Sequence, residues 1–283
     1  MRLLTFEASL TLALLSFGAR EARGQAVEIE FERVKWARLS PEDTAVRVAV
    51  LRVDPASSAT HMLYQLPPNA TSPCHWHTAS QGTMVLRGSM TVRRTGASAG
   101  PRLGVGGYSF VAGGTPFQII TGPTGAVVIA SLDGAFDIHA GSSDKCMPAG
   151  SSSPVRDSTA RAYEVEYEKI PWVTFSPKDT TVRIATLRVD PASGATHMVF
   201  NLPPNDASPC HWHSPAENNV VVRGTAGMRH NGASTRPTLG VGGYSFVPKR
   251  VPHQITTGPS GTLVFSTLDG RFDFHLVDLS QCR

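Results

Sequence analysis

The sequence of this chain contains an internal repeat, and this repeat constrains the fold more than any other feature. A shift of 136 positions lays residues 28–146 on residues 164–282 without a gap, and it places the motif SPCHWH of Ser72–His77 over the same motif at Ser208–His213. Roughly half of the aligned positions are identical, which is typical of a domain duplicated in tandem. Each repeat is about 120 residues long, an ordinary size for a domain with its own core. The chain is therefore predicted to contain two similar domains.

The repeats also set the expected domain boundaries. We expect a signal peptide at residues 1–24, an N-terminal domain at residues 27–146, a linker at residues 147–162 and a C-terminal domain at residues 163–283. The linker is predicted from its composition, since it contains the Pro-, Gly- and Ser-rich run Pro148–Pro154. A short helix near Val155–Ala162 is the alternative, and it would leave the boundaries unchanged.

The N-terminal residues are typical of a secretory signal. Arg2 precedes the apolar stretch Ala8–Phe17, and small residues near Ala22–Gly24 offer a cleavage site. Glu7 interrupts this region, so an N-terminal helix or a retained anchor is the alternative. The apolar stretch is too short to span a bilayer, and no other segment approaches that length. We expect an exported protein, periplasmic or extracellular, with no membrane span in its mature form.

The charge of the chain argues against nucleic-acid binding, and its residue pattern predicts the fold class. The formal net charge is +4, and Lys and Arg are scattered, so the chain lacks the basic stripe of a nucleic-acid-binding protein. Runs of alternating or β-branched residues recur in both repeats, and long apolar repeats at helical spacing do not. Strands are expected at Val46–Asp54, Thr60–Leu66, Leu103–Val111, Val182–Asp190, Thr196–Leu202 and Leu239–Val247, with reversals at Gly88 and Gly224. The fold class is predicted to be all-β, with a sandwich or small barrel in each half.

The four cysteines occur as equivalent pairs. Three pairings are possible, and treating the repeats alike favours two disulfides formed in an oxidising compartment, Cys74–Cys146 and Cys210–Cys282. In the rival interpretation Cys74 and Cys210 are metal ligands or reactive thiols, because each directly precedes a His-Trp-His sequence. Neighbouring residues of a strand point to opposite faces, so such a thiol is badly placed to join a metal held by the two histidines.

Candidate metal ligands concentrate in the second repeat. His211 and His213 are expected on one face of a strand, because side chains of a strand alternate. Glu217 opens the next expected strand, and His253 follows five residues after Pro248. Three imidazoles and one carboxylate suit a borderline transition metal and leave coordination positions for water or substrate.

These residues resemble the first sequence motif of the cupin superfamily. That motif is Gly, five residues, HxH, three or four residues, Glu, six residues and Gly, and this chain matches it from His211 through Glu217 to Gly224. Asp206 and neighbouring polar residues stand in the region of the leading Gly.

The second cupin motif is matched by Gly242, Pro248 and His253. Arg250 replaces a Gly of that motif and Thr257 replaces its Asn, which affects turn geometry rather than metal ligation. Since the resemblance covers both repeats, it implies two tandem cupin jelly-roll barrels, a bicupin, with the metal inside the barrel.

The first repeat carries a degenerate version of the same site. It keeps His75 and His77, but it has Gln81 and Phe117 where the second repeat has its glutamate and its third histidine. An amide brings no charge, and a phenyl ring cannot ligate, so a divalent ion would be held poorly. A structural role is expected for this half.

Other polar and aromatic residues are interpreted mainly as structural. Histidines shared by both repeats are expected to hydrogen-bond or pack: His61, His139, His197 and His275. Trp76 and Trp212 are expected to face away from the metal. Arg223 and Arg229 are expected either to bind a substrate carboxylate or to lie on a solvated strand face.

The resemblance implies a metal-dependent enzyme, oxygenase-like, that acts on a small oxygen-bearing substrate at the C-terminal domain. His211, His213, Glu217 and His253 would hold one divalent ion of Fe, Mn, Ni, Cu or Zn, and Glu217 serves as ligand or as base. A metal-dependent decarboxylase, lyase or isomerase, or a non-catalytic binding or sensory bicupin, is the alternative. The expected partner is a small molecule, and assembly into a homo-oligomer stays open.

Overall fold

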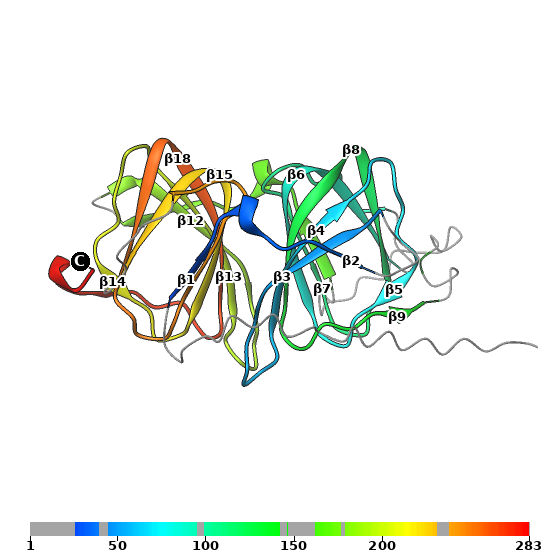
Figure 1. Cartoon of the computed structure of the whole chain (residues 1–283), viewed down its shortest axis with the longest axis horizontal. Helices are drawn as coiled ribbons and strands as arrows, with labels where there is room; N and C mark the ends of the chain where they lie inside the picture. Colours follow the sequence, from blue (N-terminus) through cyan, green and yellow to red (C-terminus); the bar gives the residue numbers. More distant parts are fainter. Residues whose placement is uncertain are drawn as a thin grey trace, which may run out of the picture.

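The computed structural model describes residues 26–39, 45–94, 99–141, 146, 162–176, 179–230 and 238–282. Within these ranges the chain forms two all-antiparallel sheets, each rolled into a barrel, and the barrels lie side by side (Figure 1). The predicted signal peptide and nearly all of the predicted linker lie outside the described residues. No helix in the described ranges is long and apolar enough to cross a membrane.

The N-terminal barrel is built mainly from the first repeat. Its strands are β2 (Ala37–Arg38), β3 (Arg47–Val53), β4 (Thr60–Leu66), β5 (His75–Trp76), β6 (Gln81–Arg94), β7 (Tyr108–Val111), β8 (Phe117–Leu132), β9 (His139–Ala140) and β10 (Ala162–Val165). Their order is β10-β7-β6-β8-β4-β3-β2, with β5 pairing to β8 and β9.

The C-terminal barrel repeats this plan. Its strands are β1 (Val27–Ile29), β11 (Val173–Ser176), β12 (Asp179–Val189), β13 (Thr196–Leu202), β14 (His211–Trp212), β15 (Glu217–His230), β16 (Thr238–Leu239), β17 (Tyr244–Val247), β18 (His253–Leu268) and β19 (His275–Leu276). Their order is β1-β17-β15-β18-β13-β12-β11, with β14 pairing to β18 and β19, and β16 to β15. The all-β prediction is confirmed.

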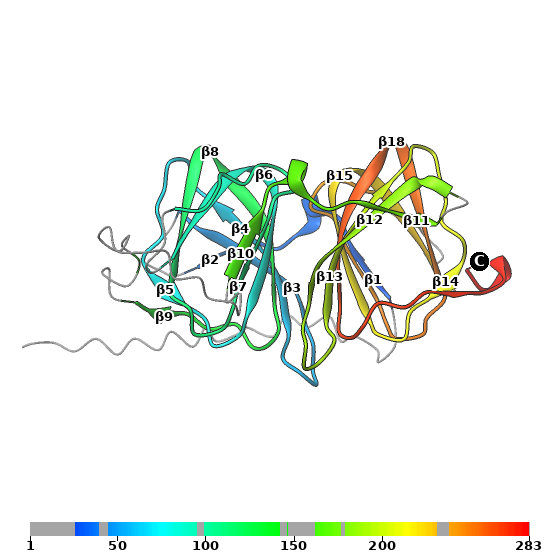
Figure 2. The same ribbon diagram turned by 180° about the vertical axis from the view of Figure 1, so that it is seen from behind.

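A bend in two long strands closes each barrel. In the C-terminal barrel β15 and β18 pair along most of their length, and the register shifts between Gly224 and Ala226. Gly224 and Gly261 both have positive φ, and a Cβ on Gly224 would lie 1.9 Å from the Gly261 carbonyl oxygen. Such bulges and glycine kinks bend a sheet. They bend β15 within its length, so the reversal expected at Gly224 is a bend inside one continuous strand rather than a hairpin. Figure 2 shows the two barrels from behind.

The two barrels exchange their first strands. β1, at the start of the first repeat, pairs with β17 of the C-terminal barrel, where Val27 lies opposite Phe246. β10, at the start of the second repeat, pairs with β7 of the N-terminal barrel, where Tyr163 lies opposite Phe110. The predicted division at residues 27–146 and 163–283 follows the repeats, whereas the sheets cross it at these two strands.

A continuous hydrophobic core joins the barrels. One cluster contains Leu63 and Tyr108 from the N-terminal barrel together with Val199 and Phe265 from the C-terminal barrel, all of them fully buried. Fully burying a large apolar side chain contributes about 1.5–3 kcal/mol. The barrels are therefore expected to fold as one unit.

Each barrel also carries one disulfide. Cys74 is bonded to Cys146 and Cys210 to Cys282, with a sequence separation of 72 residues in both cases. The predicted pairing is confirmed. The rival interpretation of Cys74 and Cys210 as metal ligands or reactive thiols is wrong, because their sulfurs are used in disulfides.

Candidate metal centre

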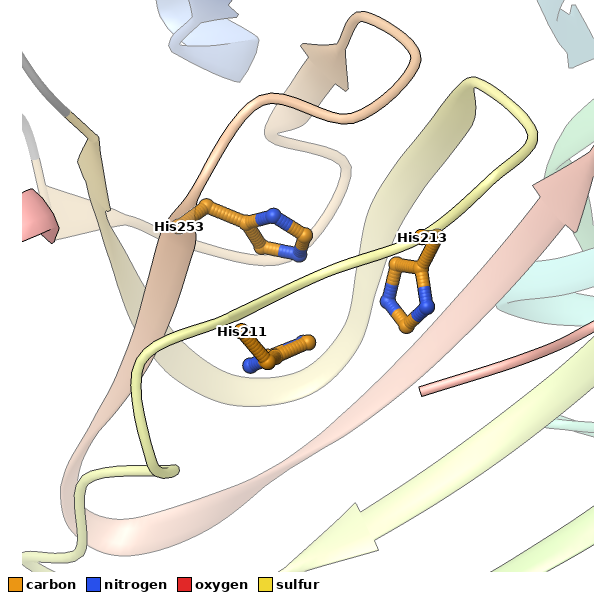
Figure 3. A group of neighbouring side chains, drawn as sticks. All are labelled: His211, His213 and His253. Carbon is orange, nitrogen blue, oxygen red and sulfur yellow. The ribbon is translucent and has the colours of Figure 1, made fainter. Parts of the chain in front are cut away.

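Three histidines of the second repeat converge inside the C-terminal barrel. His211 lies on β14 and is paired with His253, the first residue of β18, while His213 follows β14. All three side chains are buried, and one ring nitrogen from each lies within 4.8 Å of the others. Figure 3 shows the three rings pointing toward a common centre.

The carboxylate of Glu217 lies beside two of these histidines. Glu217 is the first residue of β15 and is 2% exposed. Its Oε2 lies 3.4 Å from His253 Nε2 and 3.9 Å from His213 Nε2. Ligand atoms about 2.1 Å from one ion are separated by roughly 3–4 Å. Glu217 is therefore at a ligand-like spacing from His213 and His253, beside the group of three histidines.

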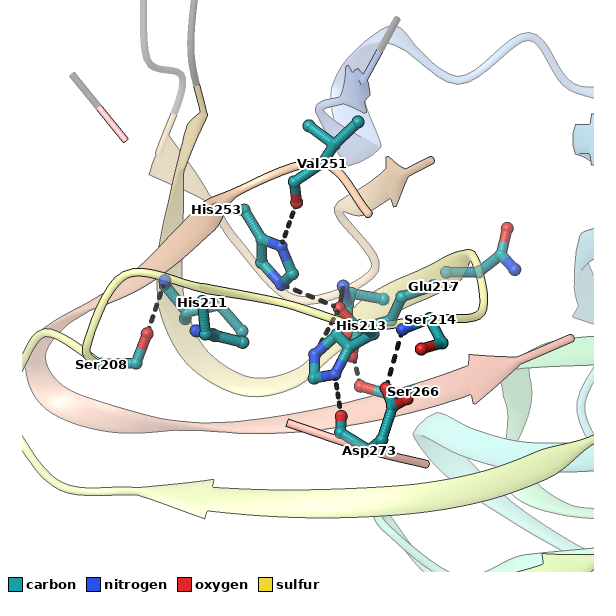
Figure 4. A network of polar contacts seen from close by, with 12 residues as sticks. Ser208, His211, His213, Ser214, Glu217, Val251, His253, Ser266 and Asp273 are labelled. Atoms are coloured by element: carbon teal, nitrogen blue, oxygen red, sulfur yellow. Dashed lines mark hydrogen bonds and ion pairs between the residues drawn. The ribbon is translucent and has the colours of Figure 1, made fainter. Parts of the chain in front are cut away.

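Backbone carbonyls fix the orientation of all three imidazoles. Nδ1 of His211 donates to the Pro209 carbonyl at 2.8 Å. Nδ1 of His253 donates to the Val251 carbonyl at 3.0 Å, and Nδ1 of His213 donates to the Asp273 carbonyl (Figure 4).

A carbonyl only accepts, so each Nδ1 carries a proton, and Nε2 is the ring nitrogen that remains available to a metal ion. Among the described residues His253 Nε2 has no hydrogen-bond partner, although it is buried and faces Glu217. Ligating histidines are usually held in this way through their other nitrogen. The residues present thus fit a bound metal ion.

The electrostatics of the site favour metal-binding protonation states. Burial, together with the neighbouring His253, lowers the pKa of His211 to about 3, so its imidazole is neutral. Burial alone would raise the pKa of Glu217. The effects of His213 and His253 and of the Asn219 amide outweigh burial and hold that pKa well below its usual range. Neutral imidazoles and an ionised carboxylate are the forms that ligate metals.

Aromatic side chains next to the histidines were not predicted. Phe274 stacks on His211 with ring centroids 4.1 Å apart, and Phe272 lies 5.3 Å from His213. The first repeat has Ile138 at the position of Phe274. This difference, within a segment that the two repeats otherwise share closely, was the available sequence signal.

A narrow pocket lies deeper in the same barrel. It is lined by Asn219, Val221, Ala226, Gly227, Met228, Leu239, Ser245, Ile255 and Val264. Asn219 and Ile255 follow Glu217 and His253 by two residues on their strands, so they lie on the same face as these ligands. The N-terminal barrel has the fully buried Met90 at the position of Ala226. The C-terminal barrel thus has a smaller side chain at this place.

The N-terminal barrel keeps the frame of the site without its full chemistry. Nδ1 of His75 donates to the Pro73 carbonyl at 2.8 Å, as its counterpart does in the second repeat. Phe117 lies 4.4 Å from His75 between ring centroids, in the place of the third histidine. The Gln81 amide donates to Thr83 Oγ1 at 2.9 Å. His75 and His77 thus lack a third imidazole and a carboxylate, as the sequence predicts.

The shared histidines make structural contacts. His61 shares a hydrogen bond with Ser131 at 3.0 Å, and His197 shares one with Tyr108 of the other barrel at 2.7 Å. His139 and His275 stack on Trp76 and Trp212, with ring centroids 4.0 and 3.9 Å apart. These contacts agree with the structural interpretation of the shared residues.

The two arginines considered for substrate binding make other contacts. Arg223 donates to the Val105 carbonyl at 2.6 Å and lies over the Tyr167 ring, so it connects the two barrels. Arg229 donates to the Gln254 side chain at 3.3 Å. Among the described contacts of Arg223 and Arg229, none involves the four candidate ligands.

Comparison with known proteins supports the fold and leaves the activity open. A family model described as "Domain of unknown function (DUF4437)" matches residues 26–275. No curated protein sequence matches the chain. Similar solved structures include a mutant oxalate decarboxylase from Bacillus subtilis, at a TM-score of 0.65 with 13% identity, covering 88% of this chain and 79% of that chain.

An oxalate decarboxylase from Lactobacillus farciminis in complex with formate is also similar, at a TM-score of 0.62 with 12% identity, covering 89% of this chain and 88% of that chain. These likenesses extend over both barrels. They confirm the predicted fold of two cupin jelly-roll barrels.

Proposed function

This chain belongs to the DUF4437 family, and we propose that it is a metal-dependent enzyme whose single active centre lies in the C-terminal barrel. His211, His213, His253 and Glu217 would hold one divalent transition-metal ion. The observation that carries the proposal is the convergence of three buried imidazoles, each oriented by a backbone carbonyl, with the carboxylate of Glu217 beside two of them. Bound there, the ion would act as Lewis acid or electron conduit for a small substrate.

The residues of the chain define what kind of substrate fits. The ligands are buried, aromatic rings cover one side of them, and the pocket beneath them is narrow and mainly apolar. We propose a small, oxygen-bearing organic substrate with an oxygenase-like reaction. The ionised Glu217 balances part of the charge of the ion, and the neutral imidazole of His211 need lose no proton on binding it.

Decarboxylation is the second candidate reaction. It is favoured by the likeness to oxalate decarboxylases over nearly the whole chain. Because the identity to them is low, the likeness bears on fold, and fold alone does not fix activity.

We also propose that the protein is exported. The two disulfides support this, since such bonds persist in oxidising compartments. N-terminal sequencing of the protein recovered from an exporting host tests it. A start near residue 25 is expected, and an intact Met1 in reduced, cell-retained protein would contradict it.

An assay of two products tests the catalytic proposal. Protein loaded with each candidate metal is mixed with diketones, flavonols and small acids, oxalate included, while O₂ uptake and CO₂ release are recorded. Turnover that is lost in the variant His253→Phe is expected. O₂ uptake would support an oxygenase, and CO₂ release without O₂ uptake a decarboxylase. Silence across the panel from metal-loaded protein would contradict an enzymatic role and favour a binding protein.

A further inference from the structure

A buried amide contacts the carboxylate of the metal centre. Asn219 lies two residues after Glu217 on β15, so both side chains point into the barrel. Asn219 Nδ2 donates to Glu217 Oε2 at 3.0 Å, and both residues are buried. Oε2 is also the oxygen that faces His253 and His213. The amide therefore acts on the very atom expected to ligate the ion.

A serine on the neighbouring strand sets the orientation of that amide. Ser266 on β18 lies opposite Asn219 in the sheet register. The Ser266 hydroxyl donates to Asn219 Oδ1 and is fully buried. With its oxygen engaged by Ser266, the amide presents its NH₂ group to the carboxylate. A chain of hydrogen bonds thus runs from Ser266 through Asn219 to Glu217.

The N-terminal barrel lacks this chain. Thr83 stands at the position of Asn219, and Ala130 at the position of Ser266. In the N-terminal barrel the first residue of the pair is the donor, because the Gln81 amide donates to Thr83 Oγ1. In the C-terminal barrel the second residue, Asn219, donates to Glu217. The alanine offers no hydroxyl. Asn219 and Ser266 therefore accompany the complete ligand set, and their counterparts accompany the degenerate one.

We propose that Asn219 and Ser266 are positioning residues that hold Glu217 as a fixed metal ligand. This inference rests on the proposed metal centre. It also decides between the two roles considered for Glu217, because a carboxylate that is buried and held by an amide does not swing away to act as a mobile base. The role of the pair is to keep Oε2 directed at the three histidines in the absence and presence of the ion.

The test uses the residues that the N-terminal barrel already carries. The variants are Asn219→Thr and Ser266→Ala, and the matched control is Thr83→Ala in the other barrel. Since the equivalent barrel folds with Thr and Ala at these places, both variants should fold, which circular dichroism checks. Affinity for Co²⁺ is measured by competition with a chelator, and the visible spectrum of bound Co²⁺ reports the ligand geometry.

We expect Asn219→Thr to weaken Co²⁺ binding about 10–100-fold, the usual effect of removing an outer partner of a ligand, and to change the visible spectrum. Ser266→Ala should change both in the same direction by a smaller factor, and Thr83→Ala should change neither. A folded Asn219→Thr variant with wild-type affinity and spectrum would overturn the inference while leaving the metal centre intact. Failure of the wild type itself to bind Co²⁺ would contradict both proposals.

Discussion

Phe117 and His253 occupy equivalent places in the two barrels. Each begins the long strand of its barrel and pairs in register with the first histidine of the HxH motif, His75 or His211. The ring centroids of the two pairs are 4.4 and 4.3 Å apart. The N-terminal barrel thus keeps the shape of the metal centre and replaces an imidazole by an apolar ring.

The first prediction is that a second metal centre can be built. The double change Gln81→Glu and Phe117→His gives the N-terminal barrel the ligand set of the C-terminal one on a backbone that already fits it. Metal analysis should show a rise from one bound ion per chain to two. Phe117→His alone, which lacks the carboxylate, should give partial occupancy. A double variant that folds and still binds one ion would show that more than these two side chains separates the barrels.

The second prediction concerns acid. Burial lowers the pKa of His61 and of His197 to about 3. Both are neutral in the folded protein, so below their ordinary pKa of 6.5 the unfolded chain binds more protons. Stability should therefore be complete above this pH and fall between about pH 6.5 and 3, by about 1.4 kcal/mol per pH unit for each histidine.

Urea unfolding at a series of pH values measures this effect. His61→Gln, which keeps a polar side chain without a titrating one, should flatten the dependence relative to the wild type. A variant with an unchanged slope would contradict a role for His61 in acid sensitivity.

The third prediction separates the two disulfides. Replacing either pair by alanines should lower the free energy of unfolding by about 2–5 kcal/mol, because each bond closes a long loop of the unfolded chain. Cys210 directly precedes His211, so the loss of Cys210–Cys282 should also weaken metal binding. Loss of Cys74–Cys146 is the matched control and should leave metal affinity unchanged. Equal effects of both changes on metal affinity would argue against a local link.

The fourth prediction concerns the pocket below the ligands. Ala226→Met introduces the residue that the N-terminal barrel buries at the same place, Met90. The pocket is narrow and already contains Met228, so the larger side chain should overpack it and lower the free energy of unfolding by about 1–3 kcal/mol, without displacing the ion. Chemical unfolding and metal content are measured together. An unchanged or higher free energy of unfolding would show that the pocket accommodates the larger side chain.

The sequence predicted features that depend on local spacing. His211 on β14 and His213 directly after it bring their rings together, as the HxH spacing predicted, and the symmetry of the repeats identified both disulfides. Features that depend on strand pairing were missed. Asn219 meets Ser266 because β15 and β18 pair in one particular register, which the spacing within either strand does not fix.

The exchange of β1 and β10 was missed for a related reason. The two repeats are so similar that each first strand is compatible with either sheet, and the connection to the rest of the chain decides where it pairs. The contact between His211 and Phe274 was not predicted either, because Phe274 lies in a segment more than sixty residues later in the chain.

Metal content of the purified protein tests the central claim most directly. Elemental analysis is carried out on the wild type and on the variant His253→Phe, so that a complete ligand set is compared with one lacking a single imidazole. The variant should fold, because the N-terminal barrel already has a phenylalanine, Phe117, at the equivalent place. The account predicts one tightly bound transition-metal ion per wild-type chain. In the folded variant it predicts a loss of affinity larger than the roughly 10–100-fold that removal of an outer partner of a ligand causes. A wild type without stoichiometric metal, or a variant that retains it fully, would contradict the account.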